Sequence, residues 1–119
     1  MNSGARYLLH FACFGCRRSH KRALEDEEFT KVCPRCGGKA VRVGRHFKAP
    51  ASDDRAQWEK VRYLVAHGFL FQHVYENPRS GARVPYPATL QEAKEFVERY
   101  RDQAWTAAMP EVHEALSTA

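Results

Sequence analysis

The four cysteines of this chain form two C-x-x-C pairs, and their spacing constrains the fold more than any other feature. The pairs are Cys13-Phe14-Gly15-Cys16 and Cys33-Pro34-Arg35-Cys36, with 16 residues between them. Two intervening residues allow a tight turn to bring both sulfurs of a pair to one ion, at about 2.3 Å from it. The spacing therefore matches that of a four-thiolate metal site, roughly C-x2-C-x15–20-C-x2-C.

Two other uses of paired cysteines are less favoured. Two disulfides would suit a secreted protein, but Arg6 precedes only a short apolar stretch, 7–11, which also holds a histidine and does not form a signal peptide. A dithiol redox motif opens a helix, whereas Cys36 is followed by two glycines and by an extended pattern at 39–43. A closed structural metal site is the favoured interpretation, with zinc ahead of iron as the ion.

Residues 6–48 resemble the zinc-ribbon (rubredoxin-like) family. The resemblance is carried by the two cysteine turns, above all by the segment Cys33-Pro34-Arg35-Cys36-Gly37-Gly38, which looks like the common C-P-x-C-G form. It implies a small antiparallel sheet with metal at one end, and one structural Zn²⁺ held by Cys13, Cys16, Cys33 and Cys36. The first turn departs from the family pattern, because Arg17 rather than glycine follows Cys16. Zinc ribbons serve transcription factors, ribosomal proteins, topoisomerases and many enzymes, so the module alone does not select a function.

Alternating or extended patterns predict three strands around the cysteines. They cover 7–12, 28–32 and 39–43, the last with a possible extension to 47. The basic run 17–22 lies between the cysteine pairs, and no regular element is predicted there. The acidic run 25–28 follows it and leads toward the second pair.

The second part of the chain reads as helix, strand and helix. After a linker, Ser52 is the expected N-cap of a helix that reaches about His67, with Gly68 as its stop. A strand is predicted over 69–75, and the prolines at 84–87 allow only an edge strand or an extended arm. The pattern Thr89-Leu90-Gln91-Glu92 is a capping box that opens a second helix, which we expect to end near Pro110.

These elements predict an α+β fold in two parts. Residues 1–48 form the four-cysteine ribbon, and residues 49–119 form a compact helical α-β-α region. The second part is too small for a large separate core, so we expect it to pack against the ribbon. Within it, the aromatic residues at 69, 71 and 75, together with His73, lie on one face of the predicted strand. Such a strip is either core or a platform on which nucleic-acid bases stack, and core is favoured.

The charge is uneven along the chain. Residues 1–48 hold 11 Lys and Arg against four Asp and Glu, whereas residues 49–119 hold eight against 10. A basic ribbon suggests contact with a polyanion. The sequence therefore predicts binding to nucleic acid, or to a nucleoprotein machine of transcription or translation. The predicted phosphate contacts are Arg17, Arg18, Lys21 and Arg22, with Arg42, Arg45 and Lys48 secondary.

Several alternatives stay open beside this prediction. A protein-interaction adaptor would use the ribbon edge or the helix faces and have no nucleic-acid role. A metalloenzyme would need an open coordination position, and an iron electron carrier would resemble rubredoxin. We expect no enzyme and no small-molecule substrate, because no H-E-x-x-H motif, phosphate loop or Ser/His/Asp pattern occurs. His10, His20 and His46 are candidates only for replacing one cysteine or for supporting the metal site.

No segment is long and apolar enough to suggest a membrane span. The longest stretch without Lys, Arg, Asp or Glu runs from 63 to 75, well short of the ~20 residues needed to cross a bilayer. A cytoplasmic protein is the expectation that follows.

Overall fold

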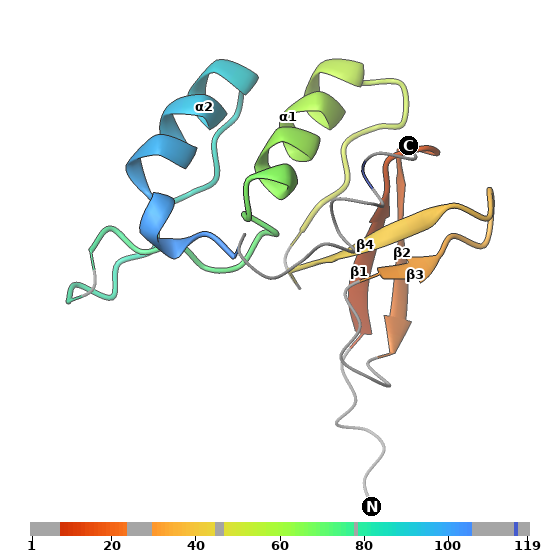
Figure 1. The fold of residues 1–119 in the computed structure, drawn as a ribbon, viewed down its shortest axis with the longest axis horizontal. Helices are drawn as coiled ribbons and strands as arrows, with labels where there is room; N and C mark the ends of the chain where they lie inside the picture. The colour runs from red at the N-terminus through yellow and green to blue at the C-terminus, as the bar shows by residue number, and fades with distance from the viewer. Residues whose placement is uncertain (1–7, 24–29, 45–46, 78, 106–115, 117–119) are drawn as a thin grey trace, which may run out of the picture.

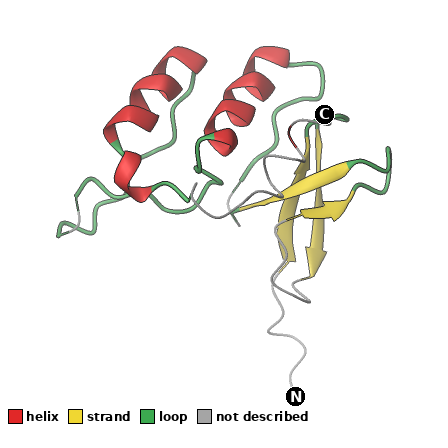
Figure 2. Ribbon diagram, viewed as in Figure 1, coloured by secondary structure: helices red, strands yellow, loops and turns green. Residues whose placement is uncertain are grey.

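The computed structural model describes residues 8–23, 30–44, 47–77, 79–105 and 116 of the chain. These residues form a four-stranded antiparallel sheet and two α-helices (Figures 1 and 2), in agreement with the predicted α+β class. The strands run in the order β2-β1-β4-β3 across the sheet. The elements are β1 (Leu8–Cys13), β2 (Arg18–Ala23), β3 (Thr30–Val32), β4 (Lys39–Val43), α1 (Arg55–Ala66), α2 (Leu90–Arg99) and a short 3₁₀ turn, η2 (Arg101–Gln103).

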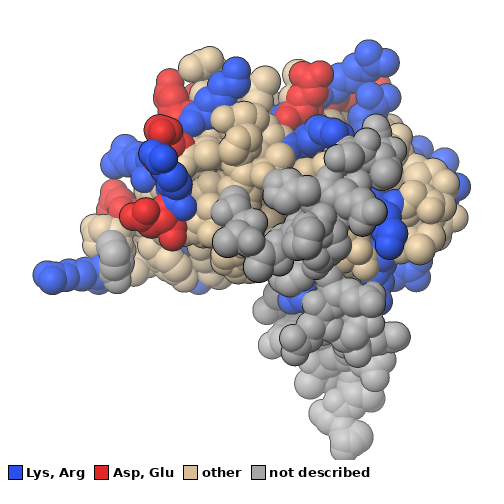
Figure 3. Space-filling model, in the orientation of Figure 1, with Lys and Arg blue, Asp and Glu red and all other residues tan. Residues whose placement is uncertain are grey.

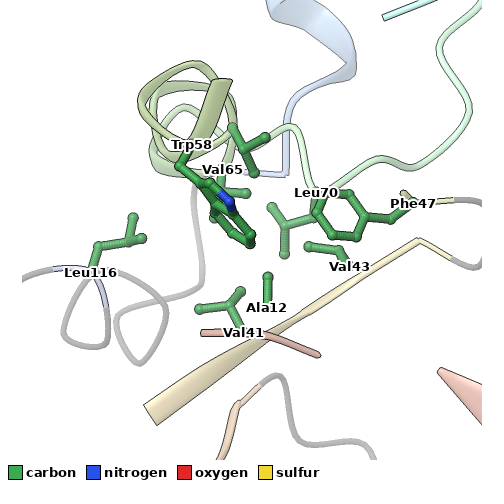
Figure 4. Packing of buried hydrophobic residues seen from close by; sticks show 9 residues of the cluster. Ala12, Val41, Val43, Phe47, Trp58, Val65, Leu70 and Leu116 are labelled. Atoms are coloured by element: carbon green, nitrogen blue, oxygen red, sulfur yellow. The ribbon is translucent and has the colours of Figure 1, made fainter. Parts of the chain in front are cut away.

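Helix α1 lies between the sheet and α2 (Figure 1) and contributes to two cores. Figure 4 shows the first core, in which Trp58 and Val65 of α1 face Ala12, Val41 and Val43 of the sheet. The second core joins α1 to α2 and is built from Leu64, Phe69, Val74, Ala93 and Phe96. Burial on both sides fixes α1 as the element to which the sheet and α2 are attached.

The register of the strands divides the sheet into two faces. Residues that pair across antiparallel strands share a face, and neighbours along a strand alternate between faces. Ala12 pairs with Val41 on the face that meets α1. The opposite face carries a smaller buried cluster that includes the two most buried cysteines: Leu9, Phe11, Cys13, Cys33 and Ala40.

Strands β1 and β4 confirm the predicted extended segments, whereas β2 was missed. The predicted 28–32 strand is shorter as β3, and residues 28 and 29 lie outside the described part of the chain. Strand β2 carries no apolar alternation, since it reads Arg-Ser-His-Lys-Arg-Ala. It forms through its backbone ladder with β1 at the sheet edge, where charged side chains are common.

The strand predicted over 69–75 is wrong. Phe69 and Leu70 are consecutive and both fully buried, and Phe71 has a left-handed φ of 66°, so no two-residue alternation exists. The Gln72 side chain accepts from the Leu70 N–H at 2.7 Å and donates to the Gly68 carbonyl at 3.0 Å. Side-chain bonds thus replace a strand ladder here, and only an isolated bridge joins Tyr75 to Arg83.

This irregular path also settles the arrangement of the aromatic strip. The Phe69 ring is buried against Phe96. The Phe71 ring stacks on Tyr86 at 4.5 Å, and His73 is exposed. The strip is therefore split between core and surface and forms no continuous stacking platform.

Both helices begin at a residue whose side chain caps the first turn, as expected, but the start of α1 and the end of α2 differ from the prediction. Helix α1 is capped by Asp54, whose carboxylate accepts from the Gln57 N–H, and not by Ser52. Thr89 caps α2 as predicted, and its hydroxyl accepts from the Glu92 N–H at 3.1 Å.

Helix α2 ends at Arg99, well before the predicted end near Pro110, which lies outside the described residues. The chain leaves the helix because tertiary bonds hold it elsewhere: the Gln103 side chain bonds both backbone groups of Tyr75, and the Trp105 N–H donates to the Gly68 carbonyl. Neither described helix has the length and apolar character that a bilayer crossing requires.

Candidate metal centre

The two C-x-x-C pairs fold into matching turns at the same end of the sheet. Strand β1 ends at Cys13, and the Cys13 carbonyl accepts from the Arg17 N–H at 2.8 Å. In the second turn the Cys33 carbonyl accepts from the Gly37 N–H at 2.9 Å. Each turn returns the chain to a strand, β2 after the first and β4 after the second. The local sequence therefore presents each cysteine pair from a closed backbone loop.

The four sulfurs form one compact group with the dimensions of a metal site. The Sγ atoms of Cys13, Cys16, Cys33 and Cys36 all lie within 4.8 Å of one another. Two of the separations are 3.6 Å for Cys13–Cys36 and 3.8 Å for Cys16–Cys33. A tetrahedron of thiolates at about 2.3 Å from an ion has an edge of about 3.8 Å. The predicted cysteines thus meet with the spacing that a four-coordinate ion needs.

The same geometry does not match either of the two rival uses of these cysteines. A disulfide requires about 2.05 Å between sulfurs, and all four cysteines are free. The first C-x-x-C pair leads through a turn into β2, and the second through a turn into β4, so neither opens a helix as a dithiol redox motif does.

The Cys33 sulfur has polar contacts with residues other than the cysteines. Its Sγ lies 3.4 Å from the backbone N–H donor of Arg35 and 3.4 Å from Nε2 of His20, which projects from β2. His20 pairs with Phe11 across the β1–β2 ladder, so the edge strand fixes the position of the imidazole. His20 therefore supports the site, as one of the sequence-based alternatives allowed.

The other two histidines singled out from the sequence do not join this group. His10 lies in β1 on the sheet face that meets α1, and its ring is 6.3 Å from the Phe47 ring. His46 is outside the described residues.

The thiols differ in how readily they ionise. Burial, with added bonds from the neighbouring thiols, raises the pKa of Cys16 to about 12. Burial also raises the pKa of Cys13. Burial opposes ionisation of Cys33 as well, but the N–H groups of Cys36 and Arg35 and the side chains of Cys13 and His20 outweigh it, and the pKa falls to about 6. With this pKa, Cys33 is mainly a thiolate at neutral pH.

Metal uptake near pH 7 is expected to release at least two protons. Cys13 and Cys16 hold raised pKa values, so they keep their protons until a cation displaces them. Apparent affinity should therefore rise with pH, by at least about 100-fold per pH unit near neutrality. Competition with a chromophoric chelator from about pH 6.5 to about pH 7.5, with the chelator calibrated at each pH, measures the slope. A release of one proton or none contradicts this assignment.

The predicted nucleic-acid contacts do not form one cluster. By the strand register, Arg18 and Arg22 of β2 and Arg42 of β4 lie on the sheet face opposite α1, whereas Lys21 lies on the other face. Lys48 is exposed in the chain leading to α1, and Arg45 lies outside the described residues.

Arg17 is separate from all of these, because it lies in the first cysteine turn beside the N-terminal half of α1. There it lines the same hollow as Arg55 and Arg62, which were not singled out from the sequence. Their spacing of seven residues, two helical turns, is the signal that places them on one helix face.

The metal group rests on its own geometry rather than on resemblance to known proteins. Three segments of the chain contribute to it: the first cysteine turn, the second cysteine turn, and β2 with His20. No family model, curated protein or solved structure matches this chain.

Proposed function

We propose that the chain is a zinc-ribbon binding protein in which one Zn²⁺, held by Cys13, Cys16, Cys33 and Cys36, is structural. The tetrahedral spacing of the four sulfurs carries this proposal. Four thiolates fill all four positions of a tetrahedral ion, so no position remains for water or substrate. The protein is accordingly proposed to bind a partner and not to catalyse a reaction.

The donor set favours zinc but also suits iron, and the two ions are easily distinguished. Elemental analysis of protein purified without added metal should give about one zinc per chain. A four-thiolate iron site would make the purified protein red, as in rubredoxin, whereas zinc leaves it colourless. Substoichiometric metal of both kinds, removable by gel filtration, would overturn the structural-metal proposal.

Nucleic acid is the proposed partner, through the basic side of the sheet. Nine Lys and Arg residues occupy described positions between residues 8 and 48, and all four acidic residues of this stretch, at 25–28, lie outside the described part. Figure 3 shows Lys and Arg side chains along the sheet side, and also among the carboxylates over the helices. The excess of 11 Lys and Arg over four Asp and Glu in residues 1–48 supports attraction of a phosphate backbone.

Charge reversal on one sheet face tests this partner. Arg18→Glu with Arg22→Glu should weaken binding of single-stranded and double-stranded oligonucleotides, because both guanidinium groups lie on the same face of the exposed edge strand β2. The slope of log affinity against log salt should fall by about 1.4–1.8, or about 0.7–0.9 for each lost phosphate contact.

A matched variant controls for the change in net charge. Two charge reversals on α2, at the exposed residues Lys94 and Arg99, alter the total charge equally and should leave the salt slope unchanged. If RNA and DNA fail to bind even at low salt, the nucleic-acid proposal is wrong, and the protein-interaction adaptor becomes the better proposal.

A further inference from the structure

The two cysteine turns differ at the residue that follows the second cysteine. Gly37 occupies this position in the second turn with φ of +78°, and Arg17 occupies it in the first with φ of +57°. Both backbones are left-handed, a conformation that glycine adopts freely and that other L-residues adopt at a cost. Glycine would therefore suit the first turn better, and the arginine at this position carries a backbone cost.

The Arg17 side chain lies at a hollow between the first cysteine turn and α1. The hollow has a volume of about 220 Å³. Its lining combines two aromatic side chains, one carboxylate and three guanidinium groups: Phe14, Trp58, Glu59, Arg17, Arg55 and Arg62. The Phe14 and Trp58 rings meet edge to face at 5.7 Å and form an apolar wall.

The three arginines are available for an anion. Among the described residues, no carboxylate forms an ion pair with them, although Glu59 lines the same hollow. Arg62 donates from Nη2 to the Leu116 carbonyl, and this bond anchors its guanidinium group. The bond uses one of the five N–H donors of the guanidinium. Arg55 is exposed at the start of α1 and Arg17 is half-buried. Among the described residues that line the hollow, three cations stand against one anion, so this part of the lining has a net positive charge.

We propose that this hollow binds a phosphate group, clamped by Arg17, Arg55 and Arg62. Guanidinium groups present planar pairs of N–H donors that match phosphate oxygens, and several of them together favour phosphate over a single carboxylate. The site rests on the metal-held turn of the proposed function, but it does not require that the sheet face bind nucleic acid. The phosphate comes either from a free phosphomonoester or from a nucleic-acid strand.

Arg17→Gly is the central variant, because it removes the guanidinium and suits the left-handed backbone. It should keep its metal and its thermal midpoint while its Kd for inorganic phosphate, followed by titration with ³¹P detection, rises at least about tenfold. Arg55→Gln removes a second guanidinium from an exposed position and should weaken phosphate binding to a similar degree. Arg79→Gln, in the exposed loop that projects beyond α2 (Figure 1), is the control and should bind as the unaltered protein does.

Three ligands distinguish the source of the phosphate. They are inorganic phosphate, a short oligonucleotide with a 5′ phosphate, and the same oligonucleotide without it. A 5′ phosphate that adds affinity only when Arg17 is present identifies a monoester site, whereas equal losses for both oligonucleotides identify a backbone phosphate. Equal phosphate binding by the unaltered protein, Arg17→Gly and Arg55→Gln would overturn the proposal.

The sheet-face variant separates this site from the proposed nucleic-acid face. Arg18→Glu with Arg22→Glu should still bind inorganic phosphate, because neither residue lines the hollow. Loss of oligonucleotide binding in that variant, with phosphate binding kept, supports both proposals. If the unaltered protein binds inorganic phosphate but does not bind oligonucleotides, the nucleic-acid proposal is refuted and the phosphate-site proposal is supported.

Discussion

Removal of the metal is expected to unfold the sheet of this protein. The four strands span only 20 residues, and two of the five side chains in the cluster on their outer face are Cys13 and Cys33 of the proposed metal site. Structural zinc supplies roughly 10 kcal/mol or more of apparent folding free energy in small four-ligand domains. That is comparable to the whole stability of a typical domain, ~5–15 kcal/mol.

Tryptophan fluorescence gives a direct readout of this loss. The Trp58 side chain is buried against the sheet, and its indole N–H donates to the Ala51 carbonyl at 3.0 Å. Trp105, the only other tryptophan, is half exposed, and Trp105→Phe leaves Trp58 as the single reporter. A strong chelator should shift the Trp58 emission to longer wavelength and abolish the β-sheet signal in circular dichroism, and added zinc should restore both.

Single cysteine variants refine the same test. Cys33→Ser removes the buried sulfur bound by His20 and Arg35, so we expect loss of metal and a sheet that unfolds below room temperature. Ser19→Ala, on the neighbouring edge strand, is the control and should keep its metal. A chelated protein with unchanged Trp58 emission and unchanged midpoint would show that the sulfur group does not stabilise the fold.

The features that could be predicted are those determined by residues close together in the sequence or by a recognised motif. Each C-x-x-C pair is a local chelate, and the 16 residues between the pairs match a known four-thiolate motif, so the meeting of Cys13, Cys16, Cys33 and Cys36 could be predicted from that motif. Thr89 and Glu92 cap α2 through bonds within one turn, and they too were predicted correctly. In each case the deciding interaction lies within four residues or within one repeated motif.

The errors occurred where distant contacts override local pattern. Strand β2 has no apolar alternation and forms only because β1 offers it a backbone ladder. The apolar run from Phe69 reads as a strand, yet the Gln72 side chain bonds the Leu70 N–H and the Gln103 side chain bonds the Tyr75 N–H, and these bonds hold the run in an irregular path. The first bond spans two residues, whereas the second joins residues 28 apart in the sequence, and no local rule identifies that distant partner.

The arginine hollow was missed for the same reason. Arg17 was singled out as one member of a basic run, but it shares a hollow with Arg55 and Arg62 only because α1 packs on the sheet. The departure from glycine after Cys16 was visible in the sequence, and it becomes informative only beside the left-handed φ of the folded turn.

Gly44 is the residue at which the sheet meets the segment after α1. It follows β4, and its N–H donates to the Leu70 carbonyl at 2.7 Å. A Cβ at this position would lie 2.1 Å from the backbone oxygen of Phe71 and 2.8 Å from the backbone carbon. The obstacle is main chain, and Phe71 already holds a left-handed φ of 66°, so no side-chain rotation relieves the overlap.

Gly44→Ala is therefore expected to separate the end of β4 from residues 70–71. The overlap costs about 3 kcal/mol and the lost hydrogen bond about 1 kcal/mol more, so the thermal midpoint should fall by roughly 15 °C. Differential scanning fluorimetry of the zinc-loaded protein measures this change, with metal content checked in parallel. Gly81→Ala is the matched control, because φ at Gly81 is +68° but no atom lies within 4 Å of the added Cβ. That variant should lose only about 1 kcal/mol, from backbone strain alone, and equal losses in the two variants would mean that the contact between β4 and residues 70–71 does not hold the sheet to α1.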